Sequence, residues 1–224
     1  MAESLPLSER PQQRPALIIF DWDDTLVDNY AAIHAAINAA RAHFNKPVWS
    51  LEETRLKCRT ALHEIFPYWF GDAWMQARDV FYRVFSEEHI AHLRIKPGAP
   101  ELLAAITHVG IPVAVNSNKS SDFLRQEVAH LGWDSFFSVL VGAGDVPRGK
   151  PAPDGVHHIR QILALSASSP TWFVGDNDMD VQTARAGGCL PILLQPHKEN
   201  EGVREGVVFV NNCHEMLDFF HTVA

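Results

Sequence analysis

The sequence predicts a doubly wound α/β fold, a Rossmann-like parallel sheet covered by helices, into which an α-helical module is inserted. Two observations predict it. From Gly98 onward, short apolar runs of strand length alternate with helical segments, and this alternation is typical of parallel sheets with right-handed crossovers. Between the first apolar run and the next strand at Val113, the pattern is helical throughout, which indicates an insertion.

The first strand is the apolar run from Leu17 to Phe20, whose β-branched composition indicates burial on both faces. Three carboxylates, those of Asp21, Asp23 and Asp24, follow it immediately. Because a buried strand does not tolerate unpaired charge, these residues are expected at its carboxyl end, where open α/β sheets bind ligands. Neighbouring carboxylates repel one another, so we expect a cation among them, and oxygen ligands favour Mg²⁺.

The insertion runs from Asn29 to about Leu93 and contains only helical signals. Apolar residues recur at helical spacing, and Ser50 with Glu53 forms a capping box. A crossover between parallel strands needs only one helix, so the surplus is expected to form a separate module. The predicted organisation is a flexible tail at 1–15, a Rossmann-like core at 16–28 and 96–224, and a helical cap at 29–95.

The rest of the core follows from the alternating pattern and its turn residues. Strands are expected at 112–116, 137–141, 171–174, 191–194 and 207–210. Helices are expected at 121–131, 153–165 and 180–186, with another at the C-terminal end.

Composition restricts the class of protein. The net charge of −8 argues against binding to nucleic acid or to an anionic membrane, and no apolar run is long enough to span a bilayer. The 3 cysteines are widely spaced, which indicates reduced thiols, and the polar N-terminal segment does not read as a signal peptide. We therefore expect a cytoplasmic protein. The 12 histidines include no H-x-x-x-H pair, which argues against a histidine metal site.

Polar residues follow two further strands. Three polar residues come after the strand predicted at 112–116: Ser117, Asn118 and Lys119. A hydroxyl group with backbone N–H groups at the start of a helix can hold an anion. The alternative is that the same residues form an ordinary helix cap and linker. Lys150 lies in Gly-Lys-Pro-Ala-Pro-Asp, where prolines stiffen the segment and would present one ammonium group rigidly to phosphate. The alternative is an exposed loop lysine.

The strand predicted at 171–174 ends in a second acidic cluster, which requires the same cation as the first. Asp176 comes directly after it, and Asp180 lies one helical turn later on the same face. Asp178 points elsewhere and is interpreted as an acid favoured by the helix dipole.

Together these motifs resemble those of the haloacid dehalogenase-like phosphohydrolases, and the spelling K-P-x-P-D is typical of the phosphoglycolate phosphatase-like branch. The resemblance implies that Asp21 is the nucleophile, that Asp23 is the acid/base, and that Thr25 orders the turn. It also implies that phosphate is bound by Ser117, Asn118 and Lys150, and that Mg²⁺ is held by Asp21, Asp176 and the backbone carbonyl of Asp23, with Asp180 acting directly or through water. Asp24 stands where the family more often has Gly, which suggests a slightly different turn.

The expected function is that of a Mg²⁺-dependent phosphatase that hydrolyses a small phosphorylated metabolite through an aspartyl phosphate, with 2-phosphoglycolate as the first candidate. An acid at Asp23 favours phosphate-oxygen chemistry over dehalogenation. A phosphosugar mutase and a sugar-phosphate or nucleotide phosphatase remain alternatives, and a non-catalytic binding protein is disfavoured by the intact charged residues. The cap residues expected to face the substrate are Arg41, Lys57, Arg59 and Arg83, and the sequence does not choose among them.

Overall fold

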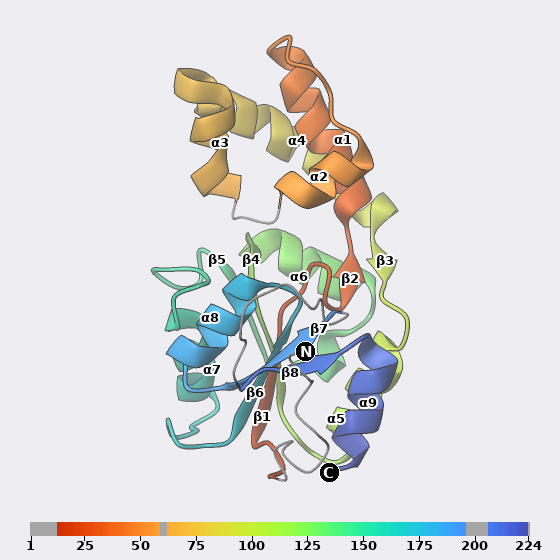
Figure 1. Cartoon of the computed structure of the whole chain (residues 1–224), viewed down its shortest axis with the longest axis vertical. Coiled ribbons are helices and arrows are strands. Elements are labelled where there is room, and N and C mark those ends of the chain that lie inside the picture. The colour runs from red at the N-terminus through yellow and green to blue at the C-terminus, as the bar shows by residue number, and fades with distance from the viewer. Residues whose placement is uncertain (1–12, 59–61, 196–205, 224) are drawn as a thin grey trace. The chain divides into compact units, whose positions relative to one another are not determined.

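The computed structural model describes residues 13–58, 62–195 and 206–223. The chain forms two compact units: one comprises residues up to Val27 and from Ile95 onward, and the other comprises Asp28–Arg94 (Figure 1). Most of the predicted N-terminal tail lies outside the described residues. Within its described end, Arg14 Nη2 donates a hydrogen bond to the carbonyl of Val109 at 2.7 Å.

The larger unit is built on a parallel sheet of six strands in the order β5-β4-β1-β6-β7-β8 (Figure 1). The first strand lies at the centre, where Ile19 is opposite Ala114 of β4 and Phe173 of β6. This topology confirms the predicted doubly wound sheet. The strands are β1 (Leu17–Phe20), β4 (Val113–Ser120), β5 (Val139–Ala143), β6 (Thr171–Gly175), β7 (Leu190–Leu194) and β8 (Val208–Val210).

Helices cover both faces of this sheet, which explains why β1 is apolar at every position. Leu17 and Ile19 share a buried cluster with Val156 and Ile159 of one helix, while Trp172 stacks on Phe219 of the C-terminal helix, with 5.1 Å between ring centroids. The helices are α5 (Ala99–His108), α6 (Ser121–His130), α7 (Asp154–Ile162), α8 (Asp178–Ala186) and α9 (Cys213–His221), and a 3₁₀ turn, η2, spans Asp134–Phe136.

The smaller unit is helical. Its helix α1 packs along α4, and its core includes Phe81, whose ring lies 5.6 Å from those of Phe66 and Phe85. The predicted capping box is present, because Ser50 Oγ accepts from Glu53 N and Glu53 Oε2 accepts from Ser50 N. The elements are α1 (Tyr30–His43), α2 (Leu51–Lys57), α3 (Leu62–Phe70), the 3₁₀ turn η1 (Gly71–Ala73) and α4 (Trp74–His92), with a two-stranded ribbon of β2 (Val27–Asp28) and β3 (Arg94–Ile95) at the boundary.

Several predicted boundaries are wrong by a few residues. The helix predicted at 180–186 begins at Asp178 because Asn177 caps it and accepts from the backbone N–H of Met179. The helix predicted at 153–165 ends at Ile162, just before Ala164 takes a φ of +53°. Strand β4 continues past Asn116 to Ser120 with an irregular register. Among the described residues, no helix combines the length and apolar character that a bilayer crossing requires.

Candidate active site

The predicted site residues gather at the carboxyl ends of the central strands. Asp21 follows β1, Ser117 lies in the last part of β4, and Asp176 follows β6. These three strands are neighbours and parallel, so their ends meet at one edge of the sheet. The backbone N–H of Asp21 donates to the carbonyl of Val174 at 2.8 Å, which ties the first strand's end to that of β6.

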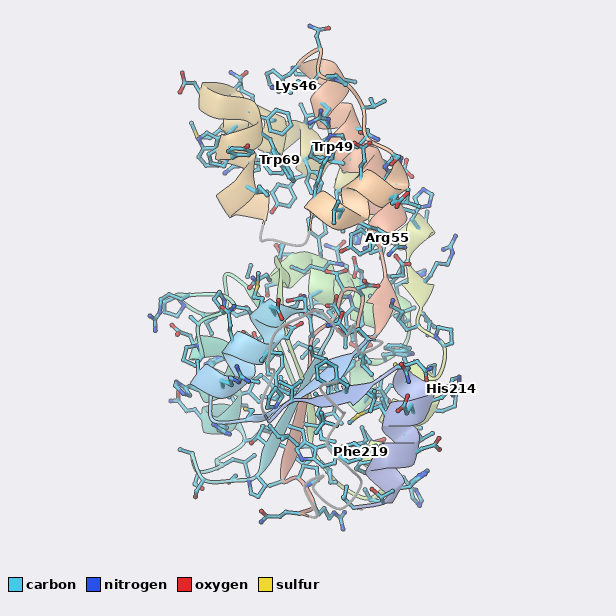
Figure 2. The ribbon with its side chains drawn as sticks, in the orientation of Figure 1. Lys46, Trp49, Arg55, Trp69, His214 and Phe219 are labelled. Atoms are coloured by element: carbon cyan, nitrogen blue, oxygen red, sulfur yellow. The ribbon has the colours of Figure 1, made fainter. Side chains whose placement is uncertain are left out.

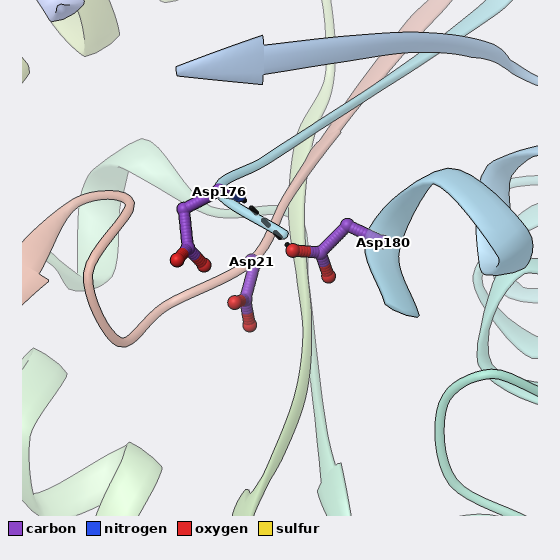
Figure 3. A group of neighbouring side chains, drawn as sticks. All are labelled: Asp21, Asp176 and Asp180. Atoms are coloured by element: carbon purple, nitrogen blue, oxygen red, sulfur yellow. Dashed lines mark hydrogen bonds between the residues drawn. The ribbon is translucent and has the colours of Figure 1, made fainter. Parts of the chain in front are cut away.

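Three carboxylates converge at this edge. Asp21, Asp176 and Asp180 each offer an oxygen atom, and these oxygens all lie within 4.8 Å of one another (Figure 3). Asp21 and Asp180 are buried, and Asp176 is partly buried. The structure thus brings together acids that are separated by the greater part of the chain.

Asp180 has both oxygens engaged by hydrogen bonds. Its Oδ2 accepts from the backbone N–H group of Asp176 at 3.0 Å (Figure 3) and from that of Asn177 at 3.2 Å, and its Oδ1 accepts from Lys150 Nζ at 2.7 Å. The approach is possible because residue 175 is glycine, since a Cβ atom there would lie 2.3 Å from the Asp180 carboxyl carbon. Asp178 is exposed at the start of α8.

Lys150 is buried within the site, so it is not the exposed loop lysine of the alternative interpretation. Its Nζ lies 2.6 Å from Asp21 Oδ1 and 2.7 Å from Asp180 Oδ1. Burial by itself lowers the pKa of the lysine, but the carboxylates of Asp180 and Asp21 outweigh it and raise the pKa above its ordinary value. Lys150 is therefore a permanent cation beside Asp21.

The Asn118 side chain fixes the backbone of Lys150. Its Oδ1 accepts from Lys150 N at 2.8 Å, and its Nδ2 donates to Lys150 O at 2.9 Å. Ser117 is buried, and its Oγ accepts from the backbone N–H of Lys119 at 3.1 Å. Both residues lie where the sequence predicts them, but the Asn118 amide is committed to holding Lys150.

The carboxylates carry more negative charge than Lys150 balances. Burial raises the pKa of Asp21 to about 7 against the opposing effect of Lys150. Burial, then the charge of Asp21, raises the pKa of Asp176 to about 8. Among the described residues, no ion pair is found for Asp176. A group of buried carboxylate oxygens with an excess of negative charge fits a hard divalent cation such as Mg²⁺.

The turn after Asp23 has the left-handed backbone that glycine favours. Asp24 has a φ of +62°, in the left-handed region that Asp tolerates better than most residues. Its carboxylate forms an ion pair with Lys96. Thr25 is buried beneath this turn, and among the described residues its hydroxyl has no hydrogen-bond partner.

The sequence analysis did not predict the ion pairs of Lys119, and it did not single out Glu127. The Lys119 ammonium group is buried against Asp23 and Glu127 rather than lying in a solvated linker. The sequence does carry a signal for Glu127. It lies three residues after Leu124 and directly before Val128, on the apolar face of a helix, where an acid requires a partner.

The predicted cap residues fall into three groups. Arg41 and Lys57 both lie over the ring of Trp49, at 4.0 and 4.6 Å from its centroid. The Trp49 ring in turn packs edge-on against Trp69 at 4.8 Å (Figure 2). Arg83 is exposed, and Arg59 lies outside the described residues.

Comparison with known proteins agrees with the motifs. The model of the haloacid dehalogenase-like hydrolase family matches residues 18–193. A phosphoglycolate phosphatase from Pseudomonas syringae pv. tomato is 29% identical over 190 residues, which cover 80% of this chain and 69% of the relative. A phosphoglycolate phosphatase from Chromobacterium violaceum is 27% identical over 212 residues, which cover 90% of this chain and 94% of the relative.

Solved structures support the fold. A haloacid dehalogenase-like family hydrolase from Streptococcus pneumoniae superposes with a TM-score of 0.79 at 20% identity, covering 93% of this chain and 99% of the other. A haloacid dehalogenase-superfamily hydrolase from Geobacter sulfurreducens superposes with a TM-score of 0.70 at 20% identity, covering 93% of this chain and 98% of the other.

Proposed function

The chain belongs to the haloacid dehalogenase-like hydrolase family, and we propose that it is a phosphatase that hydrolyses small phosphate monoesters through an aspartyl phosphate. The observation that carries this proposal is the setting of Asp21: a buried carboxylate at the carboxyl end of the central strand, with one oxygen held 2.6 Å from a lysine ammonium group. A fixed carboxylate beside a permanent cation suits nucleophilic attack on a phosphoryl group.

The proposed reaction has two steps. In the first, a carboxylate oxygen of Asp21 bonds to phosphorus as the bond from phosphorus to the substrate oxygen breaks, and Asp23 gives its proton to that departing oxygen. In the second, a water molecule bonds to phosphorus and gives a proton to Asp23, while the bond between phosphorus and Asp21 breaks. Inorganic phosphate is released and both aspartates return to their starting states.

Asp21 and Asp176 are the proposed side-chain ligands of Mg²⁺, with the backbone carbonyl of Asp23 as a further ligand. The excess negative charge of these carboxylates, which raises their pKa values together with burial, supports this role. When bound, Mg²⁺ neutralises charge on the phosphoryl oxygens. Both oxygens of Asp180 already accept hydrogen bonds, which supports a role for Asp180 in holding Lys150 and the Asp176 loop in place.

The proposed phosphate contacts are the Ser117 hydroxyl group and the Lys150 ammonium group. We propose that Asn118 contributes through its backbone N–H, because its side chain holds the Lys150 backbone. Two fixed donors and one permanent positive charge would neutralise the phosphoryl oxygens without rearrangement during the reaction.

The helical unit is the proposed cap, and its cationic residues are the proposed partners of a second negative group on the substrate. The relatives are named phosphoglycolate phosphatases, which makes 2-phosphoglycolate the first substrate to test. Because composition and net charge predict a cytoplasmic protein without a nucleic-acid or membrane partner, a small soluble metabolite is the proposed substrate class.

Steady-state kinetics with Mg²⁺ tests the proposal. We expect kcat/KM for 2-phosphoglycolate to exceed that for p-nitrophenyl phosphate by at least about tenfold, roughly 1.4 kcal/mol of discrimination in the transition state. A smaller ratio would direct the search to sugar phosphates and nucleotides. Turnover that requires a phosphosugar acceptor would identify a mutase, and no turnover with any phosphate would refute the phosphatase assignment.

A further inference from the structure

A chain of buried ion pairs connects Asp23 to helix α6. Lys119 Nζ lies 2.7 Å from Asp23 Oδ1, and it also lies 2.8 Å and 2.6 Å from the two carboxylate oxygens of Glu127. The three residues come from the loop after β1, from β4 and from α6, so they meet only through the tertiary fold. All of them belong to the larger unit.

Glu127 is fully buried, and its partners account for that placement. Besides Lys119, its Oε2 accepts a hydrogen bond from Trp22 Nε1 at 2.6 Å. Trp22 lies between Asp21 and Asp23 in the sequence, is completely buried, and packs edge-on against Trp133 at 6.0 Å. Glu127 therefore contacts the acidic loop in two ways, directly through its hydrogen bond with the Trp22 indole and indirectly through Lys119.

Lys119 is not arranged as a phosphate-binding cation. Its side chain is 5% exposed, and its ammonium group lies within 2.8 Å of three carboxylate oxygens. Lys150 has a parallel arrangement, because it links Asp21 to Asp180 of α8. Each of the two lysines thus joins one acid of the loop after β1 to one buried acid on a flanking helix.

We propose that Lys119, held by Glu127, is the positioning residue for the Asp23 carboxyl group. The inference rests on the proposed phosphatase function, in which Asp23 transfers a proton to the departing oxygen. Proton transfer requires a donor within hydrogen-bond reach of its acceptor, and Asp23 lies on a turn with a partly exposed side chain. The buried, doubly held Lys119 ammonium group restricts where its Oδ1 atom can lie.

The dependence on the leaving group separates this role from a general contribution to folding. An alkyl phosphate needs a proton on its departing oxygen, whereas 2,4-dinitrophenyl phosphate releases a stable anion without one. The measured quantity is kcat/KM, because it reports the steps up to the first transfer to Asp21 and excludes the later hydrolysis, which is the same for both substrates.

For Lys119→Met we expect kcat/KM to fall about 100-fold for an alkyl phosphate such as 2-phosphoglycolate, the lower end of what a positioned general acid contributes. For 2,4-dinitrophenyl phosphate we expect a change of less than about threefold, because no proton transfer is lost. Lys119→Arg should recover part of the loss. Arg125→Met is the matched control, because Arg125 lies on the same helix α6 as Glu127 but forms an exposed ion pair, with Asp145. This variant should leave both rates unchanged.

Lys119→Met leaves the Glu127 carboxylate without its cation, so the variant can fail to fold. Lys119→Met/Glu127→Gln removes that charge, and Glu127→Gln alone preserves the shape; both should show the same preferential loss on the alkyl phosphate. Equal losses on both substrates in the folded variants would overturn the positioning role while leaving the phosphatase function intact. Absence of hydrolysis of either phosphate by the unaltered protein would overturn the function, and this inference with it.

Discussion

Replacing Gly175 with alanine should disrupt the carboxylate cluster through a single methyl group. A Cβ atom at this position would lie 2.3 Å from both the carboxyl carbon and Oδ2 of Asp180. Ordinary contacts begin near about 3.4 Å, so the two groups must separate by roughly 1 Å. The site is buried between β6 and α8, where there is little room to absorb such a shift.

The magnitude follows from the hydrogen bonds that the shift breaks. Asp180 Oδ2 accepts from the backbone N–H groups of Asp176 and Asn177 at 3.0 and 3.2 Å. A displacement of roughly 1 Å carries both beyond hydrogen-bond distance, and each bond to a charged group contributes about 1.5–3 kcal/mol. We therefore expect Gly175→Ala to lower the free energy of unfolding by about 3 kcal/mol or more, whether the side chain or the helix moves.

Urea unfolding with excess chelator measures this loss without a contribution from bound metal. Gly110→Ala is the control for backbone strain without a clash, because Gly110 has a φ of +76° but has nothing within 4 Å of the added Cβ, whereas Gly175 has no positive φ. The control should lose only about 1–2 kcal/mol, from backbone strain alone. If Gly175→Ala were no less stable than Gly110→Ala, the close packing of Asp180 on residue 175 would not be what holds the cluster.

Three further predictions concern the proposed chemistry. Asp21→Asn should keep the fold and lose turnover, because an amide does not attack phosphorus; activity above about a thousandth of the original, roughly 4 kcal/mol of barrier, would refute the nucleophile assignment. Phosphatase activity should require Mg²⁺ and be suppressed by Ca²⁺, which takes more ligands at longer distances, whereas equal activity in excess chelator would contradict the metal site. In the chelated protein, the raised pKa values of Asp21, about 7, and Asp176, about 8, mean that the folded state prefers the protonated forms of both residues. Their contribution to stability is full below the ordinary carboxyl pKa and is lost as the pH rises from there through 7–8. Tm should therefore fall as the pH is raised to this point, and it should fall less with Mg²⁺. A chelated Tm that rose from pH 6 to pH 9 would reverse this sign.

The position of the acidic cluster at the sheet edge could be predicted from local sequence alone. Apolar runs such as Leu17–Phe20 end abruptly in carboxylates, and burial of a charged group is costly enough that the strand must end there. The same logic placed Asp176 after β6. In both cases, the physical information lies within a few consecutive residues.

Other local features required the observed backbone. A sequence pattern does not reveal that Asp24 adopts a φ of +62°, in the left-handed region. The start of α8 at Asp178 depends on the cap formed by Asn177 and Asp180, and Asp180 serves that cap and Lys150 together. These residues have more than one partner, so sequence spacing alone does not decide their roles.

Only the tertiary structure decided how the charges are paired. Lys119 meets Asp23 across 96 positions of sequence, and Glu127 meets Trp22 across 105. Hydrophobic periodicity identifies which face of a helix is buried, but not which side chain of another element lies opposite it. The burial cost of a charge shows that Glu127 needs a partner; the order of the strands and the placement of α6 beside β4 and β5 determine that this partner is Lys119.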